Sequence, residues 1–141
     1  MIRKWKEEDR EMVMELWLIS NTEVHSFIPL KYWQQNYKEI QRVIPIAETY
    51  VYEHQGKVKG FVSAMEGFLL GIFVDSAIRK HGMGTLLMDR IMQNEENLTV
   101  TVYEKNVDAV RFFMRQQFKV ESEVTEDSTG EKQLMMVWNR K

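Results

Sequence analysis

The chain has 141 residues, 44% of them hydrophobic and 28% charged, which predicts one globular domain spanning residues 1–141. It contains no cysteine, which excludes disulfides, zinc–thiolate sites and thiol catalysis and fits a reducing, cytoplasmic location. The net charge of -2 argues against a general nucleic-acid binder, and no apolar run is long enough to span a membrane. Nothing at the N-terminus has the pattern of a signal peptide.

A strand at Ile2–Trp5 opens the chain, and two helical patterns follow it. Acidic residues 7–9 suit a helix start, where the helix dipole favours negative charge. Pro29 suits the first turn of a second helix. Apolar residues at helical spacing define the inward faces, namely Met12, Val13, Leu16, Trp17 and Ile19 in the first helix and Leu30, Trp33, Tyr37, Ile40 and Ile44 in the second.

Three strands are predicted next. Thr49–His54 and Lys57–Glu66 are β-rich runs, and the Gln55-Gly56 pair between them predicts a hairpin. Phe68–Val74 is a nearly continuous apolar run, typical of a central strand that is buried on both faces.

The remainder of the chain adds two helices and three strands. A loop, 75–82, leads to a third helix in which Leu87 and Ile91 are spaced to pair. Residues 98–103 alternate as a strand does, with Leu98, Val100 and Val102 on one face and Thr99, Thr101 and Tyr103 on the other. Asn106 opens a fourth helix with Ala109, Val110, Phe113 and Met114 inward, and strands near Phe118–Thr125 and Lys132–Trp138 end the chain. The order is β-α-α-β-β-β-α-β-α-β-β, a mixed α/β fold with helices on both faces of a sheet.

The segment from 72 to 85 is the most informative for function. An apolar strand ends at Val74, a basic loop follows, and a helix begins at Gly82 and Gly84. Free N–H groups and the positive dipole end of a helix, with Arg79 and Lys80 nearby, predict a phosphate site. A plain β-to-α turn is the alternative. The Rossmann fingerprint fits less well because it needs a third glycine and a different spacing, and the Walker A loop because it needs Gly-Lys-Ser/Thr where this chain has Gly84-Thr85-Leu86.

Two motifs carry a family resemblance. Arg79-x-x-Gly82-x-Gly84, after a strand ending Phe73-Val74, resembles the acetyl-CoA signature of the GNAT superfamily of N-acetyltransferases. Asn106-x-x-Ala109-x-x-Phe112-Phe113 resembles the next motif of that family. The element order matches too, so the resemblance covers essentially the full chain, and short single-domain bacterial members are the most similar. It implies a GNAT-like central sheet that is mostly antiparallel.

The resemblance implies transfer of an acetyl group from acetyl-CoA, as cosubstrate, to a primary amine by direct attack in a ternary complex. The amine could belong to a protein lysine, a peptide N-terminus, a polyamine or an antibiotic. No metal is expected, because His25, His54 and His81 lie on unrelated segments. Nucleic acid and membrane are not expected as partners, and a homodimer is left open.

The resemblance also assigns the cofactor residues. Backbone groups of 72–74 would pair with the pantetheine arm as an added strand, and N–H groups of 80–85 would hold the pyrophosphate. Asn106 would bond the pantetheine, and the sheet should splay between 68–74 and 98–103 to admit it. The expected set is Ile72, Phe73, Val74, Arg79, Lys80, His81, Gly82, Met83, Gly84, Thr85, Asn106 and Phe113.

Three residues depart from the family pattern. Phe113 replaces a tyrosine that protonates the leaving thiolate, Thr101 replaces a glutamate base found in relatives that acetylate N-termini, and Gln117 replaces a glycine, which we expect to affect packing only. These departures support an alternative, a CoA-binding regulatory module with weak or no turnover. A protein-interaction domain without a cofactor is a third hypothesis.

Three residues are candidate catalytic replacements. Tyr103 shares a strand face with Thr101, so its hydroxyl could meet the acyl group, with packing as the alternative. Glu66 ends a strand beside the expected acceptor cleft and is a base or a solvated carboxylate. His25, in the loop between the first helices, has an unperturbed pKa near ~6.5 that suits proton transfer, although a surface histidine is commoner. Further residues expected to frame the acceptor are Glu23, Tyr32, Trp33 and Glu39.

Overall fold

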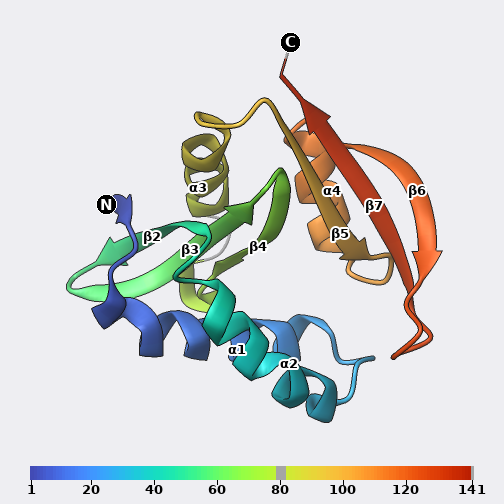
Figure 1. Ribbon diagram of the computed structural model, residues 1–141, viewed down its shortest axis with the longest axis horizontal. Helices are drawn as coiled ribbons and strands as arrows, with labels where there is room; N and C mark the ends of the chain where they lie inside the picture. The colour runs from blue at the N-terminus through green and yellow to red at the C-terminus, as the bar shows by residue number, and fades with distance from the viewer. Residues whose placement is uncertain (79–81, 141) are drawn as a thin grey trace.

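A computed structural model describes residues 1–78 and 82–140. In this part of the chain, seven strands form one sheet, and α-helices cover both of its faces (Figure 1). The strands are β1 (Ile2–Lys4), β2 (Glu48–His54), β3 (Lys57–Met65), β4 (Phe68–Val74), β5 (Asn97–Tyr103), β6 (Lys119–Thr125) and β7 (Lys132–Asn139). The α-helices are α1 (Arg10–Val24), α2 (Leu30–Val43), α3 (Met83–Met92) and α4 (Val107–Arg115), with short 3₁₀ turns at Glu7–Asp9 and Ser76–Ile78. The predicted element order is confirmed.

The strands are arranged in the order β1-β2-β3-β4-β5-β7-β6. Neighbours pair antiparallel except β4 and β5, which are parallel. Two-residue turns join β2 to β3 and β3 to β4, and the turn residues Gln55, Gly56, Glu66 and Gly67 all have positive φ. Tight hairpins favour this backbone because its twist matches that of the flanking strands. The predicted hairpin at Gln55-Gly56 is confirmed, and Glu66 lies in a turn rather than at the end of a strand.

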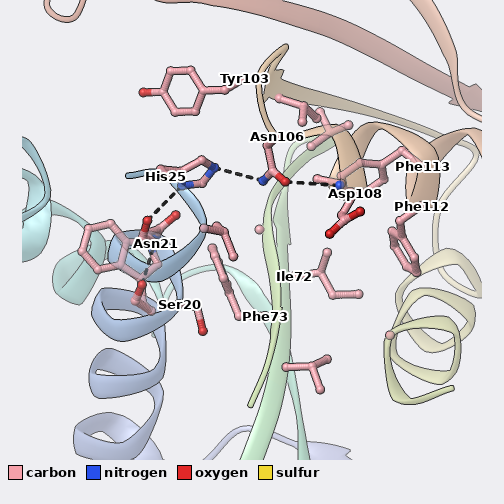
Figure 2. Close-up of a pocket in the computed structure, with 18 of the residues that line it drawn as sticks. Ser20, Asn21, His25, Ile72, Phe73, Tyr103, Asn106, Asp108, Phe112 and Phe113 are labelled. Carbon is pink, nitrogen blue, oxygen red and sulfur yellow. Dashed lines mark hydrogen bonds between the residues drawn. The ribbon is translucent and has the colours of Figure 1, made fainter. Parts of the chain in front are cut away.

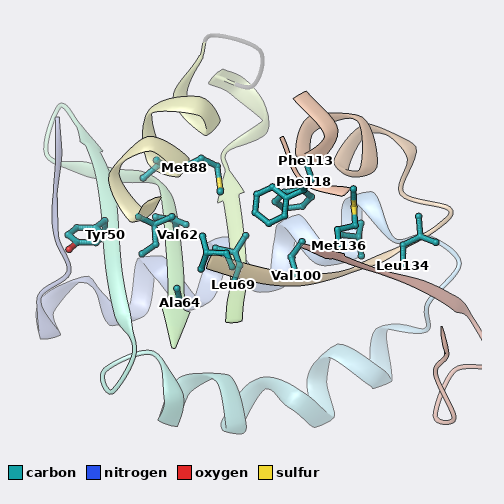
Figure 3. Packing of buried hydrophobic residues seen from close by; sticks show 14 residues of the cluster. Tyr50, Val62, Ala64, Leu69, Met88, Val100, Phe113, Phe118, Leu134 and Met136 are labelled. Atoms are coloured by element: carbon teal, nitrogen blue, oxygen red, sulfur yellow. The ribbon is translucent and has the colours of Figure 1, made fainter. Parts of the chain in front are cut away.

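Each face of the sheet has its own hydrophobic core. The core under α3 and α4 includes Leu87, Met88, Leu98 and Phe113 among its buried residues (Figure 3). The core under α1 and α2 is built around Trp17, Trp33 and other buried side chains, and it includes Tyr103 of β5. Strand β5 therefore contributes Leu98, Val100 and Val102 to one core and Tyr103 to the other, as its alternating sequence predicts.

Several apolar residues that we predicted to face inward are exposed. Leu30 and Met114 are 52% exposed, and Met12 and Ile19 exceed 40%. Met12, Ile19 and Met114 each lie one residue, or roughly 100° of helix rotation, from a buried residue of their helix, so helical spacing alone places them too far inward. Leu30 is the first residue of α2, at the end of the helix.

The apolar strand β4 is also less buried than predicted. Phe68 is 54% exposed and Leu70 is 38% exposed, so the interpretation of 68–74 as a strand covered on both faces is wrong. Leu70 lines the open space that forms where β5 diverges from β4, and Phe68, although it lies opposite Thr99, is the first residue of the strand, directly after the β3–β4 turn. Within the described residues, no helix is both long and apolar enough to cross a membrane.

Candidate active site

A cleft of about 800 Å³ opens between β4 and β5. In the described part of the chain the two strands pair at one position, Phe68 opposite Thr99, and they diverge toward their carboxyl ends (Figure 1). The register of β3 against β4 shifts between Ser63 and Ala64, which leaves Leu70 as the extra residue of a β-bulge. Alternate residues of β4 direct their backbone groups away from β3, toward the gap. The predicted splay of the sheet is confirmed.

The wall of the cleft on β4 consists of Ile72, Phe73 and Val74. Ile72 and Phe73 point to opposite sides of the strand, Ile72 toward Phe112 of α4 and Phe73 toward α1 (Figure 2). A Cβ atom at Gly71 would lie 2.4 Å from the Phe73 ring. The Phe73 ring therefore holds its position only because residue 71 has no side chain.

The N-terminus of α3 faces the same cleft. Gly82 is the N-cap residue with φ +83, a backbone conformation that glycine adopts without strain. The N–H groups of a helix's first turn have no partner within the helix, and they lie at the positive end of its dipole. Met83, Gly84 and Thr85 form that first turn and line the cleft, as a site for a phosphate group requires. A Cβ at Gly84 would lie 3.2 Å from the Phe112 ring, so Gly84 also permits the close approach of α4.

Helix α4 brings Asn106 to the cleft at its N-terminus. The Asn106 side-chain oxygen accepts a hydrogen bond from the Ala109 N–H at 3.3 Å and so caps the helix. Asp108 and Arg111 also line the cleft from α4, and Asp108 is the one carboxylate among the described lining residues. Asp108 lies in the first turn of α4, where the positive end of the helix dipole stabilises a negative charge. This stabilisation alone explains why an acidic residue occurs at this position.

The C-terminus of α4 positions Phe113, which lines the cleft but is only 4% exposed. The Phe118 N–H donates to the Phe113 carbonyl, and the Gln117 N–H donates to the Met114 carbonyl, which together form a Schellman motif. The Phe113 and Phe118 rings pack 5.2 Å apart, as that motif favours. Gln117 occupies its left-handed position with φ +74. The expectation that replacing glycine here affects packing only is therefore wrong, because it affects backbone conformation.

His25 is the C-cap residue of α1 and is 8% exposed, so the surface alternative is wrong. Its Nδ1 lies 3.2 Å from the Asn21 carbonyl oxygen, and its Nε2 lies 3.0 Å from the Asn106 amide nitrogen (Figure 2). Burial lowers the pKa of His25 below its usual 6.5, and the bond to the Asn21 carbonyl opposes this only in part. The neutral imidazole is therefore favoured, with both ring nitrogens already occupied.

Tyr103 lines the cleft, but its hydroxyl is committed to a carboxylate. It donates a hydrogen bond of 2.6 Å to Glu126, which also accepts bonds from the hydroxyls of Tyr32 and Thr129 at 2.7 and 2.6 Å. Burial would raise the pKa of Glu126, but the three donors outweigh it and hold that pKa below its usual range. Burial and the bond to Glu126 raise the pKa of Tyr103. This network joins α2, β5 and the β6–β7 loop at one end of the cleft.

Other predicted residues lie elsewhere. Glu66 is in the β3–β4 turn, at the paired end of β4, whereas the cleft opens at the other end. Glu23 is exposed on α1, and Glu39 pairs with Arg42 on α2, so neither lines the cleft. Tyr32 and Trp33 do line it. The predicted residues Arg79, Lys80 and His81 lie outside the described residues.

The sequence analysis missed Glu126. The only local signal for Glu126 is its position directly before the polar turn 127–130. That signal does not predict its hydrogen bonds to Tyr32 and Tyr103, because these residues are 94 and 23 positions away in the sequence. In the described ranges, no three His, Asp or Glu side chains are grouped so that they could hold a metal ion.

Comparisons with known proteins agree with this geometry. A family model described as "Acetyltransferase (GNAT) domain" matches residues 19–138. The chain is 34% identical over 140 residues to peptidyl-lysine N-acetyltransferase YiaC of Escherichia coli (strain K12), covering 98% of this chain and 96% of that protein. It is 26% identical over 130 residues to peptidyl-lysine N-acetyltransferase YjaB of Salmonella typhimurium, covering 92% and 90%.

Solved structures share the fold. The solution structure of apo YjaB from Escherichia coli superposes with a TM-score of 0.83 at 23% identity, covering 98% of this chain and 96% of that one. An aminoglycoside 6'-N-acetyltransferase in complex with coenzyme A superposes with a TM-score of 0.78 at 13% identity, covering 99% and 96%.

Proposed function

Because the chain belongs to the acetyltransferase (GNAT) family, and is therefore an acyltransferase that uses acetyl-CoA, we propose that it acetylates lysine side chains of proteins or peptides. The observation that carries the proposal is the 34% identity, over 98% of the chain, to a relative whose name specifies peptidyl-lysine. That relation favours lysine over a peptide N-terminus, a polyamine or an antibiotic. In this proposal, residues 1–141 act as one acyltransferase domain.

The residues around the cleft fit acetyl-CoA. The backbone of 72–74 would hold the pantetheine arm, the first turn of α3 would hold the pyrophosphate, and Asn106 would bond the arm from α4. Arg79, Lys80 and His81, outside the described residues, complete the proposed phosphate loop. When bound, acetyl-CoA supplies a thioester whose acetyl carbon bonds to the amine nitrogen as the carbon–sulfur bond breaks and coenzyme A leaves as the thiol.

The acceptor enters, in this proposal, at the end of the cleft formed by α1, α2 and β5. Aromatic side chains of Tyr32, Trp33 and Tyr103 line that end, and they suit the methylene stem of a lysine. Glu126 provides negative charge behind the two tyrosines, which favours a cationic amine over a neutral or anionic acceptor as it approaches. Glu126, rather than Glu66, is therefore the carboxylate next to the proposed acceptor end of the cleft.

None of the three residues predicted as catalytic is placed as a free base. The raised pKa of Tyr103 keeps its hydroxyl protonated and bound to Glu126, His25 uses both ring nitrogens, and Glu66 is outside the cleft. We therefore propose that the lysine amine attacks in its neutral form and that its proton leaves through water. Positioning of the two substrates then contributes to the rate enhancement without a side-chain base.

The test is acetyl transfer to two matched peptides. One has a blocked N-terminus and one lysine; the other has a free N-terminus and arginine in place of lysine. Mass spectrometry should find the acetyl group on the lysine peptide alone. Gly84→Glu, which places bulk and negative charge in the phosphate loop, should abolish both transfer and thermal stabilisation by acetyl-CoA. Acetylation of the free N-terminus alone would reject the lysine proposal, and acetyl-CoA binding without turnover on any amine would favour the regulatory module.

A further inference from the structure

We propose that His25 is a positioning residue, whose Nε2 holds the amide of Asn106 so that Asn106 can bond the pantetheine arm of acetyl-CoA. This inference rests on the proposed function, because Asn106 contacts the arm only in that proposal. It replaces the expected role of His25 in proton transfer.

The hydrogen bonds around Asn106 fix its orientation. Its Oδ1 accepts the Ala109 N–H at 3.3 Å, so its Nδ2 must face His25 (Figure 2). The Nδ2 group donates one hydrogen to Nε2 of His25 at 3.0 Å, which leaves its second hydrogen for the cleft that Asn106 lines. Nε2 must therefore be unprotonated, and Nδ1–H donates to the Asn21 carbonyl at 3.2 Å.

Aromatic contacts hold the His25 ring in the required plane. It stacks on Trp33 at 5.3 Å with an interplanar angle of 27°, and it meets Tyr103 and Phe27 edge-on at 5.1 and 5.7 Å. The ring is thus fixed from α2, β5 and the α1–α2 loop. A histidine held so firmly, with both nitrogens bonded, is built to orient its neighbour rather than to move protons.

Protonation of His25 would break this arrangement. Nε2–H would then face the Nδ2 hydrogens of Asn106, and two donors cannot bond each other. Turning the Asn106 amide over would restore that bond but would direct Nδ2 at the Ala109 N–H and remove the cap of α4. Binding of the pantetheine arm should therefore weaken as pH falls through the pKa of His25.

Other ionisable groups surround His25. Tyr103 is in ring contact, Glu126 lies beyond the Tyr103 hydroxyl, Lys105 lies 5.3 Å from the Phe27 ring that His25 meets, and Asp108 is on the first turn of α4. A variant that keeps all of these and replaces only the imidazole separates its titration from theirs.

Two substitutions of similar polarity provide the test. His25→Gln places an amide oxygen where Nε2 lies and can still accept from Asn106, whereas His25→Asn is too short and retains only a group near the Nδ1 position. Binding is measured by calorimetry for coenzyme A and for 3′-phospho-ADP, its nucleotide half, which lacks the pantetheine arm. His25→Asn should lower the affinity for coenzyme A about 3- to 10-fold, which is the effect of losing one hydrogen bond, and should leave the affinity for 3′-phospho-ADP unchanged. His25→Gln should bind both ligands within about twofold of wild type.

The pH dependence gives a second readout. Between pH 7 and 5 the wild type should lose affinity for coenzyme A relative to 3′-phospho-ADP, and His25→Gln should not. The inference is overturned if His25→Asn lowers the affinity for coenzyme A and for 3′-phospho-ADP equally. It is also overturned if His25→Asn and His25→Gln bind coenzyme A with the same affinity and the same pH dependence. Asn106→Ala serves to locate a failure: if it weakens coenzyme A while His25→Asn does not, the positioning role alone is rejected. If Asn106→Ala has no effect, both the Asn106 assignment and the inference built on it are rejected.

Discussion

Removing the hydroxyl of Tyr103 separates a structural role from a catalytic one. In Tyr103→Phe, Glu126 loses one of its three hydroxyl donors and keeps those from Tyr32 and Thr129. A hydrogen bond to a charged group contributes about 1.5–3 kcal/mol, and we expect about 1.5 kcal/mol here because Glu126 is only partly buried. Turnover should change little, since the hydroxyl donates to Glu126 and its raised pKa opposes loss of the proton.

The loss of stability should depend on pH. The folded-state pKa of Glu126 is below its ordinary 4.5, so its bonds stabilise the fold fully above pH 4.5 and are lost as pH falls through the folded-state value. Urea denaturation should therefore show a larger difference between Tyr103→Phe and wild type at pH 7 than near pH 3.

The matched control is Tyr50→Phe. The Tyr50 hydroxyl also donates to a carboxylate, Glu48 at 2.8 Å, but Tyr50 does not line the cleft. Both variants should retain turnover on the lysine peptide within a few-fold. Loss of a general acid typically reduces the rate ~10²–10⁴-fold. A loss of that size in Tyr103→Phe, with stability and Tyr50→Phe unchanged, would refute our reasoning and make Tyr103 the acid.

Three further outcomes are expected. Gln117→Gly should raise the free energy of unfolding by up to about 1 kcal/mol in urea titrations, because φ +74 strains any residue with a Cβ; a destabilised variant would contradict this. Gly71→Ala should destabilise the fold by about 1–3 kcal/mol and lower the affinity for acetyl-CoA, because the new methyl group displaces the Phe73 ring. An unchanged affinity in calorimetry would show that the position of the ring does not affect cofactor binding. Phe113→Tyr should raise kcat only a few-fold, because a thiolate whose thiol has a pKa of about 8.5 leaves tolerably unprotonated; activity appearing from an undetectable background would favour the regulatory module.

The sequence predicted the order of the elements because local signals mark most of their ends. Gln55-Gly56 has the backbone freedom of a tight hairpin, and the alternation over 98–103 separates two cores. Phe68–Val74 has no such signal for its surroundings. Its residues are equally apolar whether a neighbouring strand pairs with them or diverges, so the open edge beyond Phe68 depends on where β5 lies.

The candidate site was predictable where one contiguous segment builds it. The first turn of α3 contains its own glycines, and Asn106 caps the helix that it begins. Glu126 and the buried state of His25 were not predictable, because each depends on contacts between residues far apart in the chain. A single histidine gives no sign of whether aromatic rings will enclose it.

A seven-stranded open sheet ordinarily has two edges, but the divergence of β4 and β5 gives this one four. The outer edge strand β6 is fully solvent-facing and carries Lys119, Glu121 and Glu123, charges that discourage pairing with another chain. The inner edge on β4, residues 68–74, has no charge at all and is the kind of apolar segment that associates when uncovered. In the folded chain, the β5–β7 half, which follows β4 in the sequence, pairs with this edge only at Phe68 and forms the opposite wall of the cleft along the rest of it. Until residues 97–139 emerge during synthesis, this edge lacks even the opposite wall of the cleft, so the same strand that makes the cleft usable makes the unfinished chain prone to aggregate.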